Sequence, residues 1–236
     1  TRRVDGGDAD ALAACVGALR DGAIVAVKGV GGYHLLCRAH DAAAVARLRA
    51  RKARPHKPLA VMFPVRGTDG LDAVRDELDV DAVHAAALRD PACPIVLVPR
   101  RAGGRLPDAI APGLDEVGVL LPYSPLHALL LAAAGEPLVA TSGNVSGEPV
   151  LTDPDEAARR LAGIADAFLH HDRPIVRPAD DAVVRVVAGQ ARPLRLGRGT
   201  APLEAALGRR LAAPLLALGG QSKVTLALAF DGRVVV

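Results

Sequence analysis

The chain has 236 residues, of which half are hydrophobic but only five are aromatic, and its formal net charge is +3. This length allows one large or two modest domains whose cores are built from aliphatic side chains. No stretch is apolar over the roughly 18 residues that a membrane span needs, and the composition excludes disordered and collagen-like chains.

The cysteines and the net charge indicate the cellular compartment and the kind of ligand. The three cysteines are widely spaced and odd in number, so we expect small buried side chains without disulfides, in a reducing cytoplasm: Cys15, Cys37 and Cys93. A charge of +3 is too mild for a surface that binds nucleic acid everywhere. Because most basic residues in this chain are arginines, we expect the four lysines to have roles that require lysine: Lys28, Lys52, Lys57 and Lys223.

Capping residues and the spacing of apolar side chains predict the helices. The first has Asp8 as its cap and ends at Gly22, and the second begins at Asp41 and ends near Ala53, before Pro55. The others are expected as one or two helices within 66–90 and at 124–134, 153–161 and 203–210.

Short apolar runs bounded by turn residues predict the strands. In the first 200 residues we expect them at 23–28, 33–37, 59–63, 94–99, 117–121, 137–141, 167–170, 182–187 and 191–196. Strands and helices alternate irregularly, which favours an α/β (α+β) fold with a mixed sheet flanked by helices over a doubly wound sheet.

The C-terminal segment has a different pattern. Residues 214–218, 224–230 and 233–236 read as strands, joined by a Gly219-Gly220 turn and an Asp231-Gly232 hairpin. The chain then ends within an apolar run. We therefore expect one domain at 1–211 and the opening strands of a second at 212–236.

The densest run of charge lies at 47–57, with six cations and no acid. Helical spacing places Arg47, Arg51 and Arg54 on one face and Arg49 and Lys52 on another, so these five cations cannot all bind one ligand. Arg54, His56 and Lys57 follow in a stiff loop between two prolines, which suits a polyphosphate because little side-chain entropy is lost on binding. A solvated helix face explains a charge run equally well.

Two glycine-containing segments follow predicted strands. Residues 29–32 (GVGG) come after Lys28 but lack the third glycine of a dinucleotide fingerprint, so a tight turn explains them as well as a phosphate loop. Residues 141–144 (TSGN) offer hydroxyl, amide and backbone donors to an anion, although an ordinary turn fits equally. Ser142 lies in no nucleophile elbow, which disfavours a hydrolase.

Histidines, acids and arginines gather at 170–181 and 195–199. The spacing fits no transition-metal motif, but paired carboxylates can hold Mg²⁺ through water together with a substrate's phosphates. These segments share short cationic or hydroxyl-bearing loops at strand ends, which suit a nucleoside triphosphate and a small anion.

Five segments in family order resemble the YrdC-like domain, most closely the one within hydrogenase maturation carbamoyltransferases of the HypF type. They are residues 23–63 with KGVGGYH at 28–34, LPYSPLH at 121–127, TSGNVSGEP at 141–149, HDRPIVRPADDAVVR at 171–185 and RPLRLGRG at 192–199. Residues 214–236 resemble the start of a Kae1-like (actin-like) domain, except that 220–225 read GQSKVT where relatives often read AELKNT. The resemblance implies a twisted mixed sheet with a concave basic surface.

The resemblance also implies an activity. Family members join a carbamate-type carboxylate to the α-phosphate of ATP, giving an acyl adenylate and pyrophosphate. In the maturation enzyme, carbamoyl phosphate is cleaved and carbamoyl adenylate passes to the Kae1-like domain. That domain carbamoylates the C-terminal cysteine of an acceptor maturation protein, toward the cyanide ligands of the [NiFe] site. ATP and Mg²⁺, held mainly by ATP, are the expected cofactors.

The family's K-x-R element corresponds to Lys52 and Arg54, with Lys57 beside it, and we expect these three to be catalytic. The S-x-N element corresponds to Ser142 and Asn144. Together with the other matched segments, it predicts the residues that bind substrate or nucleotide: Lys28, Gly31, Tyr33, His34, Pro122, Thr141, Ser142, Asn144, Arg177, Asp181 and Arg195. With so few aromatics, adenine is expected between aliphatic side chains and prolines such as Pro122 and Pro125.

Three alternatives are weighed against this reading. Threonylcarbamoyl adenylate synthesis is disfavoured by the HDRPI and KGVGGYH segments, and antibiotic O-carbamoylation is disfavoured by the order of the two domains. A double-stranded RNA-binding module would use the same basic concavity, but it is the least favoured at a net charge of +3 with five aromatics.

Overall fold

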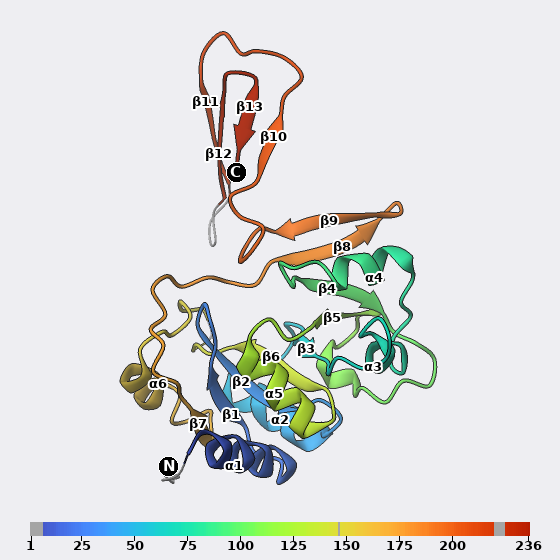
Figure 1. Ribbon diagram of the computed structural model, residues 1–236, viewed down its shortest axis with the longest axis vertical. Helices are drawn as coiled ribbons and strands as arrows, with labels where there is room; N and C mark the ends of the chain where they lie inside the picture. The colour runs from blue at the N-terminus through green and yellow to red at the C-terminus, as the bar shows by residue number, and fades with distance from the viewer. Residues whose placement is uncertain (1–6, 146, 220–224) are drawn as a thin grey trace.

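The computed structural model describes residues 7–145, 147–219 and 225–236, and it contains two sheets (Figure 1). The larger sheet has nine strands in the order β7-β1-β2-β6-β3-β5-β4-β8-β9. Their bounds are β1 Val25–Lys28, β2 Tyr33–Arg38, β3 Val61–Met62, β4 Ile95–Pro99, β5 Glu116–Leu120, β6 Leu138–Ser142, β7 Ala167–Leu169, β8 Val183–Val187 and β9 Gln190–Arg195.

The large sheet is mixed, as predicted. The pairs β1/β7, β3/β5 and β4/β8 are parallel, whereas β1/β2, β2/β6, β3/β6, β4/β5 and β8/β9 are antiparallel. Both faces of its central strands are buried, because their apolar runs alternate between two core clusters. This arrangement confirms the expected sheet flanked by helices.

Helices cover the large sheet on both faces. They are α1 Asp8–Arg20, α2 Ala42–Arg51, α3 Asp72–Arg75, α4 Ala82–Leu88, the 3-10 helix η1 Asp108–Ile110, α5 Pro125–Ala134 and α6 Pro154–Arg160. Val16 of α1 and Leu130 of α5 belong to one core cluster, and Leu48 of α2 belongs to the other. The helices therefore form a layer on each side of the sheet.

Local capping explains where several helices begin. The carboxylate of Asp41 accepts the amide of Ala44 at 2.9 Å, as expected for the cap of α2. At α1 the predicted cap was wrong by one position. Gly7 is the cap, and its amide donates to the carboxylate of Asp10 at 3.1 Å, which leaves Asp8 as the first helical residue.

The smaller sheet consists of β10 Glu204–Ala206, β11 Leu215–Leu218, β12 Leu226–Phe230 and β13 Arg233–Val235, in the order β10-β13-β12-β11. The helix predicted at 203–210 is therefore wrong. Leu203 and Val236 exchange both backbone hydrogen bonds at 2.8 Å, and this pairing over 33 positions outweighs the local helical preference. Strands at 214–218 and 233–236 are confirmed.

The domain boundary at 211/212 stays a prediction, and β10 lies before it although it pairs with β13. Lys223 and most of the second-domain signature at 220–225 lie outside the described residues. The cysteines behave as expected: Cys15 and Cys37 are buried, Cys93 is half-buried, and all three are free thiols. None of the helices in the described ranges has the length and apolar character needed to cross a bilayer.

Candidate active site

The register of β2 against β6 builds the centre of the site. His34 at the start of β2 pairs with Ser142 at the end of β6, and the amide of Gly143 donates to the carbonyl of Tyr33 at 2.5 Å. A Cβ at Gly143 would lie 2.8 Å from that carbonyl oxygen, so only glycine lets the turn pack against β2. The strand pairing therefore brings two predicted motifs side by side.

Lys52 joins the K-x-R element to the S-x-N element. It is the C-cap residue of α2 and is only 3% exposed. Its ammonium donates to the backbone carbonyl of Ser142, and to both the backbone and side-chain oxygens of Asn144 at 2.9 Å each. The Ser142 hydroxyl donates to the same Asn144 side-chain oxygen at 2.7 Å. All three ammonium donors are thus used to hold the loop at 142–144.

The environment of Lys52 disfavours its charge. Burial, followed by the nearby charges of Arg54 and Lys57, lowers the pKa of Lys52 from 10.5 to about 7. An anion next to these three cations would relieve their mutual repulsion. The cluster is therefore arranged to gain from binding a phosphate.

Arg54 and Lys57 extend the cationic wall beyond the helix. Ala53 has φ of 49°, in the left-handed region, which turns the chain out of α2 immediately before Arg54. The Arg54 guanidinium donates to the carbonyl of Pro58 at 2.6 Å. Burial and the charges of Arg49 and Arg195 lower the pKa of Arg54 to about 10.

Another wall comes from Arg195 on β9 and from Asp181, two residues before β8. Arg195 donates through Nε and Nη2 to the Asp181 carbonyl, at 2.9 and 2.7 Å. The Asp181 carboxylate lies 3.3 Å from His34 Nε2 and 3.2 Å from the Arg198 guanidinium. Burial alone would raise the pKa of Asp181, but the hydrogen bond from His34 and the charge of Arg198 hold it at about 2.

Together these walls enclose what we call the polar cavity, of about 90 Å³. Its lining unites eight predicted residues, namely Tyr33, His34, Arg54, Lys57, Thr141, Ser142, Asp181 and Arg195, with six that the sequence reading missed: Gly32, Ile95, Tyr123, Val150, Ala179 and Asp180. Gly32, Tyr123, Ala179 and Asp180 lie within the segments that resemble the family but were not singled out. Ile95 and Val150 lie outside those segments, and no sequence signal marks them.

An aliphatic groove on the open face of the sheet adjoins the polar cavity. This sheet groove, of about 430 Å³, shares Arg54, Lys57, Ile95 and Arg195 with the cavity. Leu97 on β4 and Gly118 on β5 form part of its floor, where the absence of a side chain at Gly118 leaves room. Its shape suits a flat apolar group beside the cations.

Five predicted binding residues do not line the polar cavity, namely Lys28, Gly31, Pro122, Asn144 and Arg177, and neither does the predicted catalytic residue Lys52, which holds Asn144. Lys28 is buried and donates to the carbonyl of His171 at 2.9 Å. Gly31 packs against backbone, because a Cβ there would lie 2.6 Å from the carbonyl oxygen of Ala179. Pro122 is half-buried, and Arg177 is exposed.

Half of the cations at 47–57 hold the fold together. Arg49 is 8% exposed and donates to the carbonyls of Arg54, Pro55, Lys57, Ala109 and Ile110. Arg47 donates to the carbonyl of Gly22, and Arg51 pairs with Asp166 at 2.6 Å. A solvated helix face therefore does not describe the buried Arg49, and a binding role for Arg54 and Lys57 stays a prediction.

The donor set fits a triphosphate better than a metal held by protein alone. In the ranges that the structure describes, no three His, Cys, Asp or Glu side chains are grouped to hold a metal ion. Asp180 and Asp181 nevertheless both line the polar cavity. One or two carboxylates together with substrate phosphates are a usual setting for Mg²⁺.

Residues 17–197 match the family model Sua5_yciO_yrdC, described as telomere recombination. The chain belongs to the Sua5/YciO/YrdC family. This finding confirms the resemblance stated from the sequence. The structure of E. coli YciO, with a TM-score of 0.68 at 21% identity, shares the Sua5/YciO/YrdC fold.

Among curated relatives, carbamoyltransferase HypF of Rhodobacter capsulatus is 50% identical over 232 residues, which are 98% of this chain and 30% of that protein. Threonylcarbamoyl-AMP synthase of Xanthomonas oryzae pv. oryzae is 32% identical over 186 residues, covering 77% of this chain and 89% of the relative. The chain thus spans about 30% of the length of the HypF relative, but most of the shorter synthase.

Two solved HypF structures are similar to this chain. Full-length HypF in the phosphate- and nucleotide-bound form has a TM-score of 0.85 at 40% identity, covering 95% of this chain and 35% of that one. HypF of T. kodakarensis has a TM-score of 0.87 at 33% identity, covering all of this chain and 30% of that one. The likeness extends beyond the large sheet, since it includes nearly every residue.

Proposed function

We propose that this chain is the adenylate-forming region of a carbamoyltransferase, and that it makes carbamoyl adenylate in the polar cavity. The observation that carries the proposal is the convergence of Arg54, Lys57 and Arg195 on one cavity, beside the loop at 142–144 that Lys52 holds. This combination suits the α-phosphate and the leaving pyrophosphate of ATP, which are anionic throughout the reaction.

In the proposed reaction a carbamate oxygen attacks the α-phosphorus of ATP. The bond from that phosphorus to the bridging oxygen breaks, and pyrophosphate leaves with the electron pair. Arg54, Lys57 and Arg195 stabilise the charge on the nonbridging and leaving oxygens. Carbamate is already an anion, so no general base is required.

The sheet groove is the proposed place for the purine. It is lined by aliphatic side chains such as Leu59, Ile95 and Leu97, and it meets the polar cavity at the shared cations. Mg²⁺, held mainly by ATP with Asp180 or Asp181 nearby, would neutralise phosphate charge when bound. The position differs from the Pro122 and Pro125 contacts expected from the sequence.

The wider role follows from the HypF relatives and is part of the proposal. Carbamoyl phosphate is the source of carbamate, and a Kae1-like domain passes the carbamoyl group to the C-terminal cysteine of an acceptor in [NiFe]-hydrogenase maturation. The name carbamoyltransferase HypF belongs to the relative that matches 98% of this chain. Three free cysteines fit the proposed cytoplasmic setting.

Pyrophosphate exchange into ATP tests the proposal. Labelled pyrophosphate should enter ATP when carbamoyl phosphate is added, and it should not do so with threonine plus bicarbonate. Exchange stimulated only by threonine plus bicarbonate would instead support threonylcarbamoyl adenylate synthesis, which the Xanthomonas relative makes the second candidate. Failure with both substrates would reject adenylation.

A further inference from the structure

Two buried histidines beside the polar cavity each have one ring nitrogen without a hydrogen-bond partner among the described residues. His34 on β2 is 6% exposed, and its orphan atom is Nδ1. His127 on α5 is 1% exposed, and its orphan atom is Nε2. Burying a polar atom without a hydrogen bond is unfavourable, so we expect each of these nitrogens to have a partner.

The two rings are neighbours, with centroids 5.5 Å apart and planes inclined by 31°. A five-membered ring places its nitrogens roughly 1.2 Å from its centroid, so one nitrogen of each ring would come within hydrogen-bond range, at about 3.1 Å, if both lay on the line between the centroids. The described part of the chain groups no three metal-ligating side chains, so the histidines are not a metal site there. The orphans can be satisfied by one another.

The outer ends of the pair define where the protons lie. His34 Nε2 is 3.3 Å from the Asp181 carboxylate, and an ionised carboxylate only accepts, so Nε2 carries the proton. In the neutral ring this leaves a lone pair at His34 Nδ1. His34 therefore requires a donor on its inner side.

His127 can be that donor. Its Nδ1 lies 2.9 Å from Ser124 Oγ, which already accepts the backbone amide of His127 at 3.2 Å as the cap of α5. The hydroxyl proton is thus available to Nδ1, which places the ring proton of a neutral His127 on Nε2. Burial is the largest cause that lowers the pKa of His127 to about 3, which keeps the ring neutral near pH 7.

We propose that His127 Nε2 donates to His34 Nδ1, which joins Ser124 to Asp181 through one continuous chain of hydrogen bonds. Every proton in this relay points toward Asp181. Ser124 and His127 are then positioning residues, because they hold His34 in one tautomer and one orientation at the wall of the polar cavity. Tyr123, Arg198 and His171 are the other titratable or charged groups around His127.

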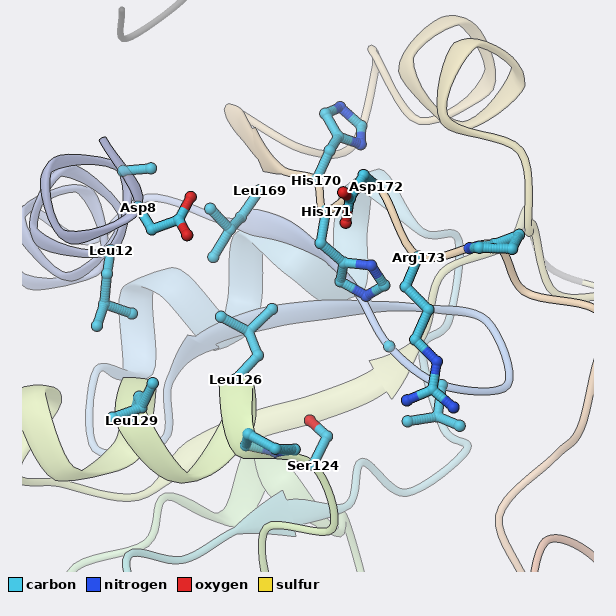
Figure 2. Close-up of a pocket in the computed structure, with 15 residues that line it drawn as sticks. Asp8, Leu12, Ser124, Leu126, Leu129, Leu169, His170, His171, Asp172 and Arg173 are labelled. Atoms are coloured by element: carbon cyan, nitrogen blue, oxygen red, sulfur yellow. The ribbon is translucent and has the colours of Figure 1, made fainter. Parts of the chain in front are cut away.

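The relay connects two cavities. Its Ser124 end lies in a separate groove of about 790 Å³ between α1, α5 and residues 169–174, which we call the helix groove (Figure 2). Ser124 and His171 both line that groove, whereas His34 and Asp181 line the polar cavity. The relay therefore makes the polar cavity depend on a side chain that lies outside it.

Nitrogen-15 NMR of the histidine rings tests the relay without any assay of activity. The neutral rings of both His34 and His127 should carry their proton on Nε2. Ser124→Thr keeps the hydroxyl and should keep both signals. Ser124→Asp keeps the helix cap but cannot donate, so it should move the His127 proton to Nδ1 and change the His34 signal. A wild-type His127 protonated on Nδ1, or a Ser124→Asp protein with unchanged His34 signals, would overturn the relay.

A matched control and an activity measurement complete the test. His84 on α4 is also 6% exposed, and it pairs with Asp81 away from the cavities, so His84→Gln should leave the His34 and His127 signals unchanged. In pyrophosphate exchange, which depends on the proposed function, Ser124→Asp should lower kcat by roughly 10- to 100-fold with KM for ATP little changed. If the NMR signals show the relay but the wild type does not exchange pyrophosphate, only the proposed function is rejected. If Ser124→Asp breaks the relay but exchanges pyrophosphate as fast as the wild type, the positioning role is rejected.

Discussion

Lys52 shows how a single side chain can serve both the fold and the site. Its ammonium bridges the end of α2 to the loop at 142–144, yet burial and its cationic neighbours lower its pKa to about 7. Whereas a lysine normally titrates near 10.5, Lys52 in the folded protein loses this charge through neutral pH. Phosphate binding would restore it.

Proton uptake on nucleotide binding follows from this shift. A triphosphate beside Lys52 favours the ammonium form and raises its pKa, so ATP binding should take up protons between about pH 7 and 8. Calorimetry in two buffers of different ionisation enthalpy should give different binding heats at pH 7.5. Lys52→Met should remove that difference, and a difference that persists in Lys52→Met would assign the proton elsewhere.

Arg49 and Arg54 should separate stability from activity, although both belong to one charge run. Arg49→Met removes the donor from five carbonyls around a buried guanidinium and should destabilise the protein by about 3 kcal/mol. Arg54→Ala should abolish exchange and leave the thermal melt nearly unchanged. Denaturant melts and exchange assays on both variants check this prediction. An equal loss of stability in the two variants would contradict the separate roles of Arg49 and Arg54.

At the level of elements, strand ends and open strand faces create the site. The alternation along β4 leaves Ile95 and Leu97 half-buried in the sheet groove while Val96 and Val98 are buried. The neighbouring β5 has Gly118 at the same groove, so the two strands leave a shallow depression beside the cations. An aromatic-poor chain can thus offer a flat apolar surface.

Filling this depression should weaken nucleotide binding selectively. A Cβ at Gly118 would lie 2.9 Å from the γ2 methyl of Ile95, so the Ile95 side chain must shift, although valine itself favours a strand. Gly118→Val should therefore stay folded with a loss in stability of about 1–3 kcal/mol, and it should raise the Kd for ATP by roughly 10-fold because the new side chain occupies the proposed purine site. Gly163→Ala, at a site with open space, should change neither property. Unchanged ATP affinity in Gly118→Val would place the purine elsewhere.

Over the whole molecule, several arginines are bonded within the fold, and the cations that face a possible ligand are concentrated at the polar cavity. Arg20, Arg47, Arg49 and Arg51 donate to carbonyl groups of the protein itself, while Arg54, Lys57 and Arg195 line the polar cavity. A net charge of +3 then leaves little for a long anionic polymer. The distribution fits a small phosphorylated ligand.

Salt dependence distinguishes the two kinds of ligand. Affinity for double-stranded RNA, measured by fluorescence anisotropy from 50 to 200 mM salt, should be weak, with a slope that reports no more than about two phosphates. A steep slope that reports several phosphates would revive the RNA-binding reading. ATP competition should then separate the two, because RNA bound at the polar cavity would be displaced.

Local patterns in the sequence were sufficient for the elements whose signals lie within a few residues. Asp41 and Ser124 cap α2 and α5 through bonds to residues three positions away, and the apolar runs of β1, β2 and β6 mark buried strands wherever they pair. The motif residues Lys52, Ser142 and Asn144 were also found from the sequence. What they do to one another was not.

Only the tertiary structure decided which charges and polar atoms meet. The sequence singled out Arg54 but could not show that Arg49 donates to carbonyls about 60 positions away, and β10 became a strand only through pairing with β13. His127 ends a matched segment but was not singled out, yet its ring lies beside His34 from a different element. Capping and periodicity act along the chain, so the sequence by itself determines much of the secondary structure. Tertiary hydrogen bonding and burial act between residues that are distant in the chain, so only the tertiary structure decides which side chains form the site.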